Sequence, residues 1–191
     1  MRSNTITPLL KTCIVHALLL LLEEKELDAI SVTEIVARAG VNRSTYYRHF
    51  SSKADVVRYF YAVRLDEYLE TLPAAPEPEA YFTGMFESFL RYKRELLLLH
   101  RRELSYLLLE EMNARVPPPP DPARGDAVSL YGSYHIGGVF NSFLYWLRGE
   151  MAIPPVRLAR LCVEMLPADF QPQLLLPDQT KEEEDGPLPH H

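Results

Sequence analysis

Apolar residues recur along most of the chain with the three- and four-residue spacing of helices, and proline-rich stretches separate the helical patterns. Every stretch with a clear pattern is helical, so the sequence predicts an all-α protein. In chain order, the pattern predicts helices over residues 8–26, 32–39, 44–50, 53–72, 79–116, 126–150 and 154–166. The stretch 79–116 fits two or three helices, and the prolines at 117–120 predict an extended spacer.

The helix predicted over 32–39 carries a signal at each end. Ser31, followed three residues later by Glu34, matches a capping box, in which each residue's side chain binds the other's backbone N–H. Gly40 suits the left-handed position that follows many helices. Asn42 or Ser44 can cap the next helix, only a few residues later. Two short helices joined by a tight glycine-containing turn are typical of a helix-turn-helix.

The second of these short helices has an apolar and a polar face. Tyr46 and Phe50 are four residues apart, so they share one side and are expected to anchor the helix. The side chains left facing outward are those of Arg43, Ser44, Thr45, Tyr47, Arg48 and His49.

Charge along the chain supports a surface for a polyanion. The 191 residues carry a net charge of −6, yet residues 31–53 hold four arginines or lysines and one glutamate, a net charge of +3. A polyanion would be attracted to this segment and repelled by the rest of the chain. An ordinary solvated helix face is the alternative that charge alone leaves open.

In a helix-turn-helix, the N-terminal part of the second helix contacts base edges in the major groove. Arg43 can bind guanine, and Thr45 can contact a thymine methyl group. Tyr47 and His49, further along, are predicted at phosphates. Lys53 is predicted to share a phosphate with the N-terminal amides of the following helix. On the preceding helix, the residues predicted at the opposite backbone strand are Ser31 and Thr33.

Other functional classes find no support in the sequence. Cys13 and Cys162 lie far apart with no metal-ligand spacing, which argues against a disulfide framework or a metal site. No nucleophile, zinc-protease, Walker or dinucleotide motif occurs, so we expect neither an enzyme nor a cofactor. The apolar run 14–22 is too short to span a membrane, and we expect a cytoplasmic protein without a membrane partner.

The stretch I-S-V-T-E-I-V-A-R-A-G-V-N-R-S-T-Y-Y-R-H-F-S-S-K, Ile30 to Lys53, resembles the DNA-binding motif of the tetracycline-repressor (TetR) family of bacterial transcription regulators. The resemblance covers roughly residues 8–60. It implies base contacts from Arg43, Ser44 and Thr45, and backbone contacts from residues that include Tyr47, His49 and Lys53. Arg48, where some members carry an aromatic residue, would add a phosphate or base contact.

The resemblance also implies a domain division. We expect a helix-turn-helix DNA-binding domain over residues 1–52 and a helical ligand-binding, regulatory and dimerisation domain over 53–170. The polar, charged residues 171–191 are expected to be a disordered tail.

The segment G-G-V-F-N-S-F-L-Y-W-L-R-G-E, residues 137–150, is similar to a subgroup related to dihydroxyacetone-kinase activators. In that subgroup the last two helices pair with those of a second subunit as a four-helix bundle. The implied interface residues are Gly137, Gly138, Phe140, Asn141, Leu144 and Trp146. A helix buried within one monomer, or a glycine kink beside a pocket, are the alternatives.

Family members often release DNA when a small molecule binds the C-terminal domain. The candidate pocket residues here are Tyr61, Phe86, Tyr92, His100, Tyr106 and His135. The expected function is therefore a regulator that binds a palindromic operator in double-stranded DNA as a homodimer, chiefly as a repressor, with release by an effector. The alternative is an effector-independent DNA-binding dimer that acts with a protein partner or organises DNA.

Overall fold

The computed structural model describes residues 6–115 and 125–166, and its elements confirm the all-α fold class. The helices, in chain order, are α1 (Ile6–Glu24), the 3₁₀ turn η1 (Leu27–Ala29), α2 (Val32–Ala39), α3 (Arg43–His49), α4 (Lys53–Leu69), α5 (Pro78–Leu90), α6 (Lys93–Arg101), α7 (Tyr106–Ala114), α8 (Gly125–Arg148) and α9 (Pro155–Glu164). The predicted stretch 79–116 contains three helices. The spacer 117–120 and the tail 171–191 lie outside the described residues.

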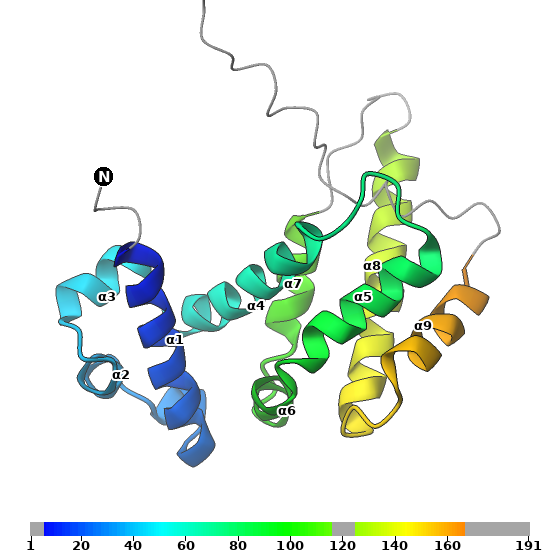
Figure 1. The fold of residues 1–191 in the computed structure, drawn as a ribbon. Coiled ribbons are helices and arrows are strands. Elements are labelled where there is room, and N and C mark those ends of the chain that lie inside the picture. The colour runs from blue at the N-terminus through cyan, green and yellow to red at the C-terminus, as the bar shows by residue number, and fades with distance from the viewer. Residues whose placement is uncertain (1–5, 116–124, 167–191) are drawn as a thin grey trace, which may run out of the picture.

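Helices α1–α3 form a head at one end of the molecule, and α5–α9 form a body at the other (Figure 1). Helix α4 contacts both, because it packs against α1 on one side and against α5 and α7 on the other. Arg102, the C-cap residue that follows α6, also joins the two parts. Its guanidinium donates hydrogen bonds to Leu22 O at 2.7 Å and Glu23 O at 3.2 Å, and it pairs with the carboxylate of Glu26.

The predicted helix caps of the head are present. Ser31 and Glu34 form the capping box at the start of α2, and Gly40 ends that helix with a φ of +67°. A side chain at Gly40 would be strained, since L residues rarely adopt this backbone conformation. Asn42 caps α3, and Ser52 forms a second capping box with Asp55 at the start of α4. These side chains accept hydrogen bonds from backbone N–H groups at the helix starts, which have no partner within the helix.

A row of aromatic rings holds α3 against the rest of the head. Tyr46 is fully buried and Phe50 is 4% exposed. The ring of Phe50 lies 5.7 Å from that of Tyr59 in α4, and the ammonium group of Lys11 in α1 lies 4.7 Å from the Tyr59 ring centre. The predicted anchoring role of Tyr46 and Phe50 is confirmed.

The core of the body corrects part of the predicted dimer interface. Trp146 is 1% exposed, donates its indole N–H to Ile153 O at 2.8 Å and packs its ring 5.3 Å from that of Phe86. Phe140 is also buried. Both side chains are therefore buried within one chain, and the indole ring of Trp146 packs against α5 through Phe86.

His135 of α8 lies in the same aromatic region. It is buried, and its ring centre lies 5.9 Å from that of Phe82 and 6.5 Å from that of Tyr81. Burial lowers the pKa of His135 from 6.5 to about 4, since the charged imidazolium is poorly solvated there.

The hydroxyl of Tyr46 is buried without a hydrogen-bond partner among the described residues, whereas the buried hydroxyl of Tyr68 donates to Tyr81 O at 2.6 Å. We expect Tyr46→Phe to leave the free energy of unfolding unchanged or raise it by up to ~1 kcal/mol, because it removes a desolvated group and breaks no bond. The matched change Tyr68→Phe should lower that free energy by ~1 kcal/mol. Urea unfolding measures both, and equal losses in the two variants would contradict the geometry.

Between pH 6.5 and pH 4 the unfolded chain binds a proton at His135 that the folded chain excludes, so folding stability should fall as the pH drops through this range. From pH 7 to pH 5 the loss should be about 2 kcal/mol. In His135→Phe this component should vanish, and the difference in stability between pH 7 and pH 5 should shrink by that amount. Denaturant titrations at both pH values test the expectation, which fails if the two proteins show the same pH dependence.

Candidate nucleic-acid interface

The outward face of α3 is polar and cationic. Arg43, Ser44, Tyr47 and Arg48 are exposed, while Thr45 and His49 are half-buried. The two adjacent tyrosines lie in different surroundings: Tyr47 is 55% exposed and Tyr46 is fully buried. Their rings make an edge-to-face contact, with the centroids 5.3 Å apart. The structure thus brings the residues predicted on α3 together on one helix.

The start of α3 is held by Asn42. Its side-chain oxygen accepts hydrogen bonds from the Thr45 amide and from the Ser44 hydroxyl, both at 2.7 Å. The Ser44 hydroxyl proton is therefore engaged locally, and its oxygen keeps an acceptor site. Arg43 lies in the first turn of α3, and its long side chain ends in a guanidinium group whose N–H donors form a planar fork.

On α2, Ser31 and Thr33 are both exposed, but their situations differ. The Ser31 hydroxyl donates to a carboxylate oxygen of Glu34 at 2.8 Å and accepts from the Glu34 amide at 3.2 Å. A hydrogen bond from Lys25, together with those from Ser31, lowers the pKa of Glu34 to about 2. The capping box therefore uses the hydroxyl of Ser31 beside an ionised carboxylate, and Thr33 is the better placed of the two for a phosphate.

Lys53 is the first residue of α4, as predicted, and its ammonium group is hydrogen-bonded within the head. Its ammonium group donates to three backbone carbonyl oxygens in the connection between α1 and α2, those of Leu27 at 2.6 Å, Asp28 at 3.2 Å and Ile30 at 2.7 Å. Local sequence signals could not show this, because the acceptors lie more than twenty residues earlier in the chain.

Of the six predicted pocket residues, His135 lines the cavity between α8, α9 and α5, and the other five are not part of its lining. Tyr61 and Phe86 are core residues, and the Tyr92 hydroxyl donates to Glu67 at 3.0 Å. His100 Nδ1 lies 3.1 Å from the Ser105 hydroxyl, and Tyr106 is half exposed. These five side chains therefore do not share one pocket with His135.

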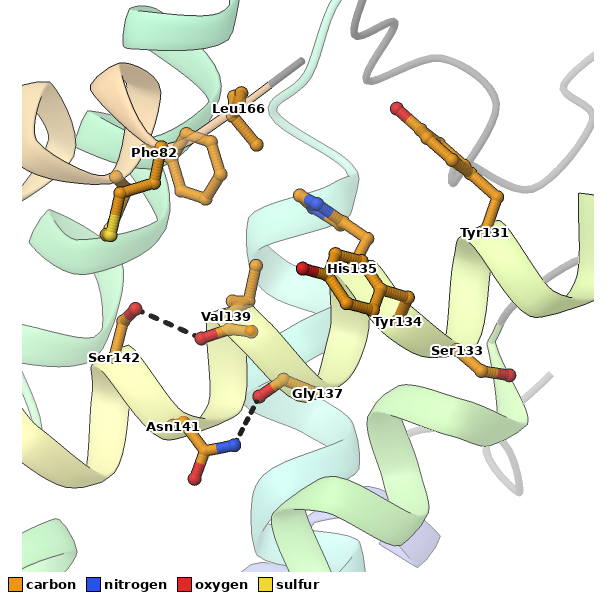
Figure 2. Close-up of a pocket in the computed structure, with 13 residues that line it drawn as sticks. Phe82, Tyr131, Ser133, Tyr134, His135, Gly137, Val139, Asn141, Ser142 and Leu166 are labelled. Atoms are coloured by element: carbon orange, nitrogen blue, oxygen red, sulfur yellow. Dashed lines mark hydrogen bonds between the residues drawn. The ribbon is translucent and has the colours of Figure 1, made fainter.

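The cavity itself lies between α8, α9 and α5 and has a volume of about 530 Å³. Phe82 of α5 and Leu166, just beyond α9, face His135 across it (Figure 2). Ser142 and Asn141 bond to carbonyls of their own helix, at 3.0 Å to Gly138 O and 2.8 Å to Gly137 O. The remaining lining includes Tyr131, Val139, Cys162 and Met165. Sequence spacing did not reveal this set, since it depends on how α9 packs beside α8.

Exposed large apolar side chains concentrate on α8 and α9. Of nine large apolar side chains exposed in the described part of the chain, six lie there, namely Leu130, Tyr134, Tyr145, Val156, Leu161 and Met165. Gly138 and Asn141, two of the predicted interface residues, are exposed on the same side of α8 as Tyr134 and Tyr145. A Cβ atom added at Gly138 would meet no other atom within 4 Å. We refer to this surface as the α8–α9 face.

Other kinds of site find no support in the described ranges. No helix there is long and apolar enough to cross a membrane. Within the same residues, no group of three or more histidine, cysteine, aspartate or glutamate side chains is arranged to hold a metal ion.

Residues 14–60, which extend from α1 through the helix-turn-helix into α4, match the family model of bacterial regulatory proteins of the tetR family. A solved tetR-family transcriptional regulator from Streptomyces coelicolor is similar over 80% of this chain and 78% of its own, with 18% sequence identity and a TM-score of 0.44. A search of curated protein sequences finds no match. The matched segment contains the exposed, cationic α3, so the head of this chain is similar to the corresponding segment of bacterial regulatory proteins of the tetR family.

Proposed function

We propose that the chain binds a palindromic operator as a homodimer and represses transcription in the bacterial cytoplasm. The observation that carries this proposal is the outward face of α3, which presents cations and hydroxyls while Tyr46 and Phe50 are buried beneath it. The net charge of +3 over residues 31–53 favours phosphate approach at this end of an acidic chain.

Base contacts are assigned to the first turn of α3. Arg43 is exposed there and can form two hydrogen bonds to a guanine, while Ser44 and Thr45 offer a hydroxyl and a methyl group. Contacts to the DNA backbone are assigned to exposed or half-buried side chains at the edges of the head, namely Ser31, Thr33, Tyr47, Arg48 and His49.

Homodimer formation is assigned to the α8–α9 face. Large exposed apolar patches commonly mark protein interfaces, and two copies of this face would bury each other's tyrosine, leucine and methionine side chains. Gly137, Gly138 and Asn141 remain in the proposed interface, with Leu144 half-buried at its edge. The narrower likeness to regulators related to dihydroxyacetone-kinase activators rests on the sequence of residues 137–150 alone.

Release of DNA by an effector is favoured over effector-independent binding because the body contains a cavity of drug-like size. Its lining is mostly apolar and aromatic, and its polar groups include the His135 ring, the Ser142 hydroxyl and the Asn141 amide. A small apolar or aromatic molecule with one or two polar atoms fits this chemistry. To release DNA it must bind more tightly to the conformation that DNA does not favour.

If Arg43 contacts a base, Arg43→Ala should relax the sequence preference of the protein at one position of each half-site and cost about 1–3 kcal/mol of specific binding. Selection of bound duplexes from a random pool, for the variant and the unmodified protein, measures this. The matched control is Arg101→Ala, an exposed arginine on α6, which should leave the preference intact. An unchanged preference in Arg43→Ala would remove Arg43 from base recognition.

Replacement of Gly138 by leucine tests the proposed dimer interface without disturbing the folding of the monomer. The added side chain meets no atom of its own chain near the Cβ position and improves helix propensity, so the monomer should remain folded. In the proposed dimer it would collide with the partner, so the mass in solution should fall from that of a dimer to that of a monomer. Asn113→Leu, at an exposed position of α7, is the control and should leave the mass unchanged.

Sedimentation or light scattering measures these masses, and circular dichroism checks that the helices persist. A Gly138→Leu variant that stays dimeric would place the interface elsewhere.

A further inference from the structure

The three carbonyls that contact Lys53 form a negatively polarised group. Leu27 and Asp28 belong to η1, and Ile30 follows it, so their carbonyl oxygens lie at the C-terminal end of a short helix. A carbonyl oxygen carries partial negative charge and two lone pairs, so the Leu27 oxygen, which also accepts the Ile30 N–H at 3.2 Å, can still accept a bond from Lys53. An ammonium ion has three N–H groups and no acceptor, so these three contacts use every donor of Lys53.

The position of Lys53 in the chain gives this contact a mechanical consequence. Lys53 is the first residue of α4, whose N-terminus is fixed by the Ser52–Asp55 capping box. The connection that it contacts leads directly into α2, whose N-terminus is fixed by Ser31 and Glu34. One side chain therefore ties the start of α4 to the start of α2, with α3 between them in the sequence.

We propose that Lys53 is a positioning residue of the head, which sets the spacing between the N-termini of α2 and α4 and does not bind a phosphate. A phosphate contact by its amine would break charge-assisted hydrogen bonds to the three carbonyls. The proposal rests on the proposed function in one respect, because the spacing matters to DNA only if both helix starts face its backbone.

The first test needs no DNA. Lys53→Met keeps much of the length and apolar stem of the side chain but removes all three donors. Native-state hydrogen exchange should then be at least about tenfold faster at the amides of residues 27–34, since the connection loses its tie to α4. Arg48→Met, which removes an exposed cation from α3, should leave those amides unchanged. Unchanged exchange at residues 27–34 in Lys53→Met overturns the proposal.

The second test separates positioning from phosphate binding. Affinity for a 30-base-pair duplex of mixed sequence is measured against salt concentration, and each neutralised phosphate contributes about 0.9 to the slope of log K against log[salt]. Lys53→Met should keep the slope of the unmodified protein, whereas Arg48→Met should lose about 0.9 if Arg48 binds a phosphate. A loss of that size in Lys53→Met overturns the proposal, even if exchange at residues 27–34 is also faster.

A third measurement covers the case in which Lys53→Met does not fold. In the unmodified protein, the ¹⁵Nζ resonance of the Lys53 ammonium group should keep its chemical shift when the duplex is added. A change in that resonance as large as those of amides on α3 shows a phosphate contact and overturns the proposal. If the unmodified protein shows no salt-dependent affinity for the duplex, the proposed function fails, while the exchange result still decides whether Lys53 ties α2 to α4.

Discussion

The burial of Tyr46 and Phe50 beneath α3 is the constraint on which the head depends. A helix of seven residues is unstable alone in water, so α3 exists because its apolar side is packed. Tyr59 and Lys11 continue that contact into α4 and α1. The same packing decides which side chains face outward. A substitution that removes this ring packing would therefore change the orientation of Arg43 and its neighbours without altering those side chains themselves.

The cavity proposed to bind an effector and the face proposed to form the dimer share residues of α8. Tyr134, Gly138 and Asn141 line the cavity and also lie on the exposed side of α8. A ligand in the cavity and a second copy on the α8–α9 face would therefore contact the same stretch of helix, which couples their binding free energies. Arg102 and α4 each contact α1 as well as the body.

The sequence predicted the elements set by local rules, and it failed where a contact spans distant residues. Ser31, Glu34 and Gly40 fix the ends of α2 through interactions within a few residues, so their roles follow from spacing. Trp146 looked suited to an interface because it lies on an apolar helix, but periodicity does not say which neighbour an apolar side contacts. The cavity and the carbonyl contacts of Lys53 depend on the packing of separate helices, which a single sequence does not specify.

The central claim is that DNA contacts the head through α3 and the start of α2. Amide chemical-shift mapping of the ¹⁵N-labelled protein, titrated with a duplex that the protein itself selects from a random pool, tests it most directly. The account predicts that the largest shifts occur at residues 31–33 and 43–49, with the exposed sides of α6 and α7 unaffected. Largest shifts on α6 or α7, or no shift on α3 at saturating duplex, would contradict it.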